Sequence, residues 1–139
     1  MLVRLVVAVV LFAVLGALAW WWERRRRRDA PTQTPGVAPT QLDRADFPRP
    51  DAPWLVVLFT SNTCESCAGL YDKAAALESD EVVVVEIEYF AHRDLHARYQ
   101  VDAAPMTLVA DADGVVRLSF LGAFAAPELW TAVAELRAG

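Results

Sequence analysis

Two cysteines, Cys64 and Cys67, are the only cysteines of the chain, and they stand three positions apart in the segment FTSNTCESCAGLYDKAAAL. This spacing fits a redox couple, half of a metal site or a structural disulfide. A zinc site requires about four ligands, and the chain offers only two histidines besides the cysteines. A disulfide across so short a loop contributes little loop-closure stabilisation. The pair therefore favours redox chemistry, with a metal site as the weaker alternative.

The position of the pair along the chain indicates a role for each sulfur. Cys64 follows an apolar run at residues 54–59 and begins a segment with helical spacing at residues 64–77. A cysteine at such a junction lies at a helix N-terminus, where unpaired N–H groups and the helix dipole stabilise a thiolate. We therefore expect Cys64 to be the nucleophile. Cys67, one turn later and expected to be more buried, would resolve the mixed disulfide.

The remaining patterns predict an alternation of strands and helices. Continuous apolar or β-branched runs predict strands, and apolar residues three and four positions apart predict helices. Asp113 and Gly114 form a hairpin signal between the last two strands. The expected strands are residues 54–59, 82–90, 106–111 and 115–122, and the expected helices are residues 64–77, 93–101 and 126–138. The first strand, helix and second strand form a βαβ unit with an expected right-handed crossover.

Taken together, this order of elements resembles the thioredoxin fold over about residues 45–138. The resemblance depends on the strand before the cysteines, the Cys-Glu-Ser-Cys motif, Pro105 at the start of the third strand, the Asp-Gly hairpin and Gly122. Cys64 and Pro105 are 41 residues apart, near the usual spacing of the family. The resemblance implies an α/β fold with a central mixed sheet flanked by helices. It also implies a cis Ala104–Pro105 bond that faces the motif and helps to hold the substrate chain.

The sequence departs from the family pattern at the motif itself. Thr63 stands where an aromatic residue usually precedes the first cysteine, and Leu58 stands where a buried acid assists proton transfer. Glu65 and Ser66 replace the usual Gly-Pro pair. The Glu65 carboxylate opposes a neighbouring thiolate electrostatically. These departures leave the fold expectation intact and favour a slower or more selective oxidoreductase.

The N-terminal segment has the properties of a membrane anchor. Residues 5–22 form a run of 18 residues without charge, about 27 Å long as a helix, against a hydrocarbon thickness of roughly 30 Å. Tryptophans at 20–22 and arginines at 24–28 follow the pattern of a membrane interface. We expect contact with lipid through residues 2–22. A cleaved signal peptide, with a candidate site at residues 17–19, is disfavoured because the arginine block opposes translocation.

These observations divide the chain into three parts. Residues 1–23 are the expected anchor, residues 24–44 a basic flank and Pro-rich linker, and residues 45–139 the thioredoxin-like domain. Residues 29–139 carry 7 basic and 17 acidic side chains, a net charge of −10. An acidic domain of this kind excludes nucleic acid as the expected partner.

The sequence therefore predicts a single-pass membrane protein that exchanges disulfides with protein partners and needs no cofactor besides its cysteines. Two alternatives remain open, namely an interaction module without turnover and a metal-handling protein that uses the cysteines with His92 and His96. Two observations about the side of the membrane oppose each other. Membrane-anchored relatives often work outside the cytoplasm, but the arginines at 24–28, against Arg4 before the apolar run, favour a cytoplasmic domain.

Overall fold

The computed structural model describes residues 1–26 and 37–139, with side chains described for residues 1–20 and 37–139. The N-terminal helix is α1 (Leu2–Arg26). Its segment Leu2–Trp20 has a mean hydropathy of 2.7 and is not buried against other residues. The expected apolar helix is therefore present, although the same length and composition also fit a signal sequence. The predicted Pro-rich linker falls largely outside the described residues.

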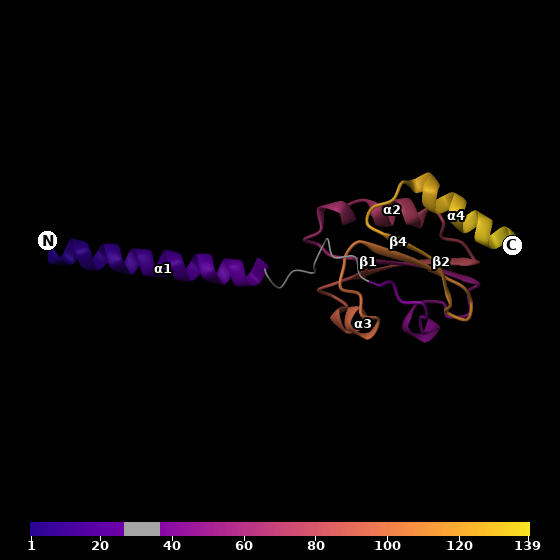
Figure 1. The fold of residues 1–139 in the computed structure, drawn as a ribbon, viewed down its shortest axis with the longest axis horizontal. Helices are drawn as coiled ribbons and strands as arrows, with labels where there is room; N and C mark the ends of the chain where they lie inside the picture. The colour runs from indigo at the N-terminus through magenta and orange to yellow at the C-terminus, as the bar shows by residue number, and fades with distance from the viewer. Residues whose placement is uncertain (27–36) are drawn as a thin grey trace.

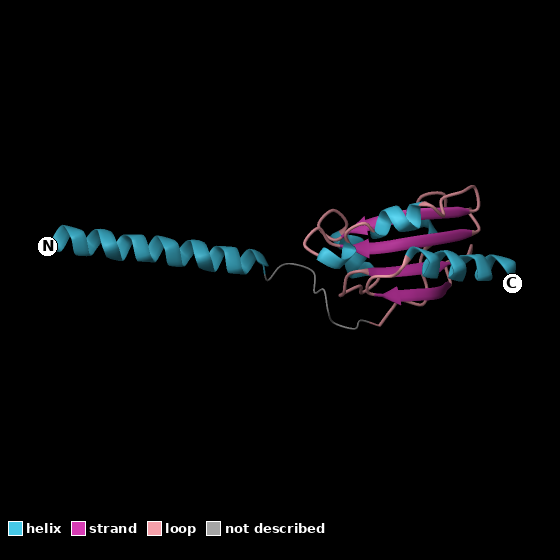
Figure 2. Ribbon diagram, turned by 90° about the horizontal axis from the view of Figure 1, so that it is seen from above, coloured by secondary structure: helices cyan, strands magenta, loops and turns pink. Residues whose placement is uncertain are grey.

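A mixed sheet of four strands forms the centre of the second part of the chain (Figures 1 and 2). The strands are β1 (Trp54–Thr60), β2 (Val82–Glu88), β3 (Met106–Ala110) and β4 (Val116–Leu121). Their order is β2-β1-β3-β4, with β1 parallel to β2 and the other neighbours antiparallel. This arrangement confirms the predicted α/β class with a central mixed sheet.

Helices cover both faces of the sheet. Figure 1 shows α2 (Leu70–Ala75) and α4 (Ala126–Ala138) on one face and α3 (Arg93–Arg98) on the other. The central strand β1 is buried along almost its whole length, which explains its continuous apolar sequence. The edge strand β4 instead alternates between half-buried and exposed positions.

Two hydrophobic clusters fill the layers between helices and sheet. The cluster on the α3 face includes Leu42 and Phe47, which precede β1 and dock against it together with the 3₁₀ turn η1 (Arg44–Asp46). The cluster on the opposite face joins alternate residues of β1 and β2 to Leu70 of α2 and Leu129 of α4. Leu42 is 1% exposed, so the core begins before the predicted domain start at residue 45.

The prediction of one continuous helix over residues 64–77 is wrong. The structure has a 3₁₀ turn, η2 (Glu65–Cys67), followed by α2, which begins only at Leu70. Gly69 lies between them with φ of 73°, a left-handed conformation that no continuous α-helix contains. Tyr71, which lies in the first turn of α2, is 39% exposed.

The other elements follow the predictions with small changes at their ends. The helix expected at residues 93–101 ends earlier, because Gln100 adopts a positive φ of 53°. The strand expected at residues 82–90 ends at Glu88. The C-terminal helix has the predicted bounds, with Pro127 in its first turn.

Candidate active site

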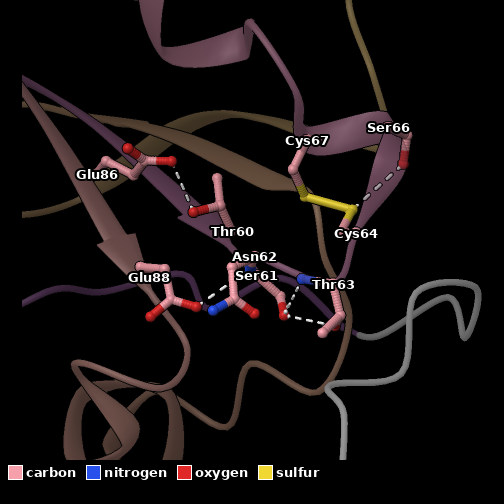
Figure 3. The surroundings of a disulfide bond; sticks show 9 residues. All are labelled: Thr60, Ser61, Asn62, Thr63, Cys64, Ser66, Cys67, Glu86 and Glu88. Atoms are coloured by element: carbon pink, nitrogen blue, oxygen red, sulfur yellow. Dashed lines mark hydrogen bonds between the residues drawn. A yellow bond between two sulfur atoms is a disulfide. The ribbon is translucent and has the colours of Figure 1, made fainter. Parts of the chain in front are cut away.

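The two cysteines lie just beyond the end of β1 and form a disulfide (Figure 3). The Cα atoms of Cys64 and Cys67 are 5.4 Å apart. Cys64 is 6% exposed and Cys67 is 7% exposed, and Ala104 packs with them in a small cluster of its own. The expectation that Cys67 is the more buried of the two is therefore wrong, because the short η2 turn places both sulfurs at a similar depth.

The η2 turn sets the local geometry of the pair. Cys64 stands at its N-cap with extended backbone angles, and its side chain accepts no capping hydrogen bond. The backbone N–H of Cys67 donates to the carbonyl oxygen of Cys64 at 3.2 Å. Cys64 therefore lies at the N-terminus of a short 3₁₀ turn and not of the long helix that was predicted, since α2 starts six residues after Cys64.

One hydroxyl group contacts the first sulfur of the motif. The Oγ of Ser66 lies 3.4 Å from the Sγ of Cys64, and Figure 3 shows this side chain directed toward that sulfur. The hydroxyl of Thr63 pairs instead with that of Ser61 at 3.0 Å. Of the predicted motif residues, Ser66 thus contacts a cysteine sulfur, whereas the hydroxyl of Thr63 is turned toward the preceding loop.

A cavity of about 390 Å³ opens beside the disulfide and is lined by both cysteines. Its wall also contains three carboxylates that were not predicted from the sequence, which belong to Asp72, Glu86 and Glu88. Asp72 comes from α2 and the two glutamates come from the C-terminal half of β2. No lysine, arginine or histidine lines this cavity in the part of the chain that the structure describes.

The two glutamates hold the end of β1 and the loop that precedes the cysteines. Glu86 accepts a hydrogen bond from the hydroxyl of Thr60 at 2.8 Å. Glu88 accepts from the backbone N–H groups of Asn62, at 3.1 Å, and Ala91, at 2.9 Å. The signal that could have revealed them is their alternation, since they are polar residues two positions apart in an otherwise apolar strand.

Leu58, at the position of the acid that the family usually buries, is fully buried. Its register partner on the neighbouring strand is Glu86. Directly paired residues of adjacent strands point to the same face of a sheet. The acid is therefore absent from β1, and a carboxylate stands beside that position on β2.

The loop before β3 brings the second predicted group to the cysteines. The Ala104–Pro105 peptide bond is cis. Ala104 is 2% exposed and belongs to the cysteine cluster. The carbonyl oxygen of Pro105 accepts a hydrogen bond from the N–H of Gly122 at 2.9 Å. The structure thus brings Cys64, Cys67 and Ala104 together, although they are distant in sequence.

The two histidines lie away from this arrangement. His96 is 3% exposed, and its Nε2 lies 2.9 Å from the carbonyl oxygen of Ile87. Burial lowers the pKa of His96 below its ordinary value of 6.5, against the opposing effect of that carbonyl. His92 is exposed. Within the described residues, no three His, Cys, Asp or Glu side chains are placed to hold a metal ion.

Solved structures share this architecture. The germline-specific thioredoxin Deadhead from Drosophila melanogaster is 21% identical, with a TM-score of 0.56 over 73% of this chain and 99% of that chain. Chloroplastic thioredoxin z is 23% identical, with a TM-score of 0.55 over 64% of this chain and 81% of that chain. The chain has the thioredoxin fold. No protein-family model and no curated protein matches the sequence.

The thioredoxin fold explains why these residues meet. In its mixed sheet, β1 and β3 are antiparallel neighbours, so the end of β1 and the start of β3 lie at the same end of the sheet. The disulfide that follows β1 is therefore adjacent to the cis-proline loop that precedes β3. A close cysteine pair on this fold indicates a thiol–disulfide redox function.

Proposed function

We propose that the protein is a thiol–disulfide oxidoreductase acting on protein partners, with Cys64 as nucleophile and Cys67 as resolving cysteine. The observation that carries the proposal is the disulfide itself, which lines an open cavity and packs against Ala104 of the cis-proline loop. In this proposal Ala104 and Pro105 hold the substrate chain beside the sulfurs. Exchange of this kind requires no cofactor.

The reaction in the reducing direction has two steps. The Cys64 thiolate attacks one sulfur of the substrate disulfide, and the other substrate sulfur leaves as a thiolate and takes up a proton. Cys67 then loses its proton and attacks the Sγ of Cys64, which releases the second substrate thiol. The substrate gains two electrons and two protons, and the protein ends with the Cys64–Cys67 disulfide. The reverse sequence oxidises a dithiol.

The acidic surroundings support the expectation of a slow or selective enzyme. Glu65 is adjacent to Cys64, and three further carboxylates line the same cavity. Nearby negative charges oppose formation of a thiolate. Since the thiolate is the attacking species, a general reductant would be expected to carry fewer such charges.

We further propose that α1 anchors the domain in a membrane through residues 2–22. The support is the uncharged apolar run, its tryptophan and arginine flank, and a helix long enough to cross a bilayer. The arginine flank favours a cytoplasmic position for the domain.

An interaction module without turnover is the second candidate. It is favoured by the apolar Leu58 in place of an acid and by the interruption at Gly69, which removes the long helix behind the motif. The two candidates differ in whether the cysteines react. An interaction module would bind its partner through the surface of the domain, whether or not the cysteines react.

Trapping of a mixed disulfide tests the proposed function. The full-length chain in detergent is compared with the variants Cys67→Ser and Cys64→Ser, using a disulfide-containing protein such as insulin as substrate. We expect wild type to accelerate reduction of insulin by dithiothreitol, Cys67→Ser to accumulate a covalent adduct, and Cys64→Ser to do neither.

The outcomes separate the candidates. Equal trapping by both variants would overturn the assignment of Cys64 and Cys67 to their roles. No turnover by wild type, with no adduct from either variant, would favour the interaction module. The adduct is measured by non-reducing electrophoresis, and its loss on reduction serves as the control.

A further inference from the structure

We propose that the hydroxyl of Ser66 donates a hydrogen bond to the Cys64 thiolate in the reduced protein and that this bond makes Cys64 the more reactive sulfur. Ser66 would then be a catalytic residue, because it contacts the reacting atom. The inference rests on the proposed function and deepens it, since it names the group that activates the nucleophile.

The contact that carries the proposal is already present in the oxidised protein. The Oγ of Ser66 is 3.4 Å from the Sγ of Cys64, within reach of a hydrogen bond to the larger sulfur atom. The two residues are two positions apart in the tight η2 turn, and Figure 3 shows the serine directed toward Cys64 rather than toward Cys67. Among residues 37–139, this hydroxyl is the only group hydrogen-bonded to either cysteine sulfur.

No backbone N–H group of residues 37–139 donates a hydrogen bond to the sulfur of Cys64. The N–H groups of Cys67 and Ala68 donate to the carbonyl oxygens of Cys64 and Glu65, respectively. The dipole of α2 acts mainly within its first turn, and that turn starts at Leu70, after the left-handed residue. The N–H groups of Glu65 and Ser66 donate to no backbone carbonyl within the described residues, but the hydroxyl of Ser66 is the donor that already contacts the Cys64 sulfur.

The charges around the cavity increase this dependence. Glu65 precedes Ser66 in the chain, Asp72 faces the cavity from α2, and Glu86 and Glu88 face it from β2. All of these carboxylates disfavour a thiolate, and the described cavity wall holds no cation to offset them. A hydrogen bond to a charged group is stronger than one between neutral groups, so Ser66 stabilises the thiolate more than the thiol.

The size of the effect follows from the strength of such a bond. A hydrogen bond to a charged group that contributes at the lower end of the usual range changes a pKa by about one unit. Loss of the bond reduces the thiolate fraction at low pH about tenfold. The freed thiolate is also more basic, and its intrinsic nucleophilicity rises about threefold. Below the pKa, the smaller thiolate fraction lowers the reaction rate and the higher nucleophilicity raises it. Above the pKa the thiol is fully ionised, so only the higher nucleophilicity changes the rate.

The experiment measures the alkylation rate of Cys64 with iodoacetamide between about pH 5 and 10. It uses the full-length chain in detergent with Cys67→Ala in every variant, so that one thiol is present and no new hydroxyl is introduced. Ser66→Ala removes the donor and Ser66→Thr retains it. Ser61→Ala is the matched control, because its hydroxyl bonds Thr63 and does not contact the sulfur.

We expect Ser66→Ala to raise the pKa of Cys64 by about one unit, to lower the rate below that pKa about threefold and to raise the plateau at high pH about threefold. The two pH profiles should therefore cross. Ser66→Thr should restore the parent profile, and Ser61→Ala should leave it unchanged. A merely structural role for Ser66 would lower the rate at every pH without a crossing.

Three results would overturn the inference, and the two that contradict it alone are distinguishable from the one that also contradicts the proposed function. A reactive Cys64 whose pH profile is the same in the parent and in Ser66→Ala contradicts this inference alone, as does failure of Ser66→Thr to restore the profile. A Cys64 that does not react as a thiolate at any pH in the parent contradicts the proposed function as well. Far-ultraviolet circular dichroism of each variant verifies that the fold is retained.

Discussion

At the residue scale, the two sulfurs of the disulfide differ in their hydrogen bonding and not in their burial. Cys64 and Cys67 are exposed to nearly the same extent, but only the sulfur of Cys64 has a hydroxyl partner among the described residues. Around both sulfurs the carboxylates of one cavity wall oppose ionisation. In the proposed mechanism, the reactivity of Cys64 thus depends on a local donor that acts against a negative environment.

A second residue-scale feature, the buried His96, predicts how stability depends on pH. Its pKa is lowered by burial. In the unfolded state His96 therefore becomes protonated near pH 6.5, whereas in the folded state it becomes protonated only at a lower pH. As the pH falls below 6.5, the unfolded state binds more protons than the folded state, and the free energy of unfolding decreases. Above that pH the contribution of His96 is constant.

Urea unfolding at pH 7.5 and pH 5 measures this dependence. We expect the free energy of unfolding to decrease from the higher to the lower pH, and we expect the decrease to be smaller in His96→Gln. His92→Gln is the matched control, because His92 is exposed and is the smallest of the causes that act on the pKa of His96, and it should behave nearly like wild type. An unchanged pH dependence in His96→Gln would show that other groups are responsible.

At the element scale, two glycines have a positive φ. One interrupts the helix that was expected after the cysteines, and the other lies in the turn of the β3–β4 hairpin. Gly69 has φ of 73° and an added Cβ would meet no atom within 4 Å. Gly114 has φ of 78° in the β3–β4 hairpin, and an added Cβ would overlap the carbonyl oxygen of Leu42. That carbonyl belongs to the segment that pairs with the hairpin and β4, since the N–H of Leu42 donates to the carbonyl oxygen of Gly114 and the N–H of Val116 donates to that of Thr40.

These glycines give a paired prediction for stability. Gly69→Ala should lower the free energy of unfolding by about 1 kcal/mol, the backbone penalty of a left-handed residue. Gly114→Ala should lower it by on the order of 3 kcal/mol, because a steric overlap adds to that penalty. Denaturant unfolding of both variants measures the difference. Equal losses would mean that the segment before β1 moves away from the hairpin without cost.

At the scale of the whole molecule, the chain joins one apolar helix to one acidic domain. The apolar segment of α1 has the length of a bilayer span, and the arginines that follow this segment set the expected orientation. The domain carries its disulfide near the surface of the fold, beside an open cavity. In the proposed membrane-anchored arrangement, the side of the membrane would determine whether this site meets reduced or oxidised partners.

Labelling of cells with a membrane-impermeant maleimide tests the proposed orientation. With the domain in the cytoplasm, intact cells should show no labelling of Cys64 or Cys67, and labelling should appear after permeabilisation and mild reduction. Pretreatment with an impermeant reductant is the necessary control, because an external domain could be fully oxidised and mimic an internal one. Labelling of intact cells after that pretreatment would reverse the orientation or favour the signal-peptide alternative.

Local patterns in the sequence were sufficient to predict the order of strands and helices, the cysteine motif and the apolar N-terminal helix. These features depend on segments of about 20 residues or fewer, such as the continuous apolar run of β1 and the spacing of α4. Pro105 could be assigned to the site from the sequence only through the resemblance to a known fold. No local pattern brings it near a cysteine 41 positions earlier.

The environment of the sulfurs, in contrast, depends on the three-dimensional packing. The pairing of Leu58 with Glu86 follows from the register between β1 and β2, and this register brings the carboxylates of β2 to the cavity beside the cysteines. The helix expected from residue 64 is interrupted at Gly69, which has a left-handed conformation. The sequence did not predict this interruption, because helical spacing of apolar residues does not reveal a left-handed residue. The contact between Ser66 and Cys64 arises from the tight turn that replaces that helix, so it could not be inferred from the motif alone.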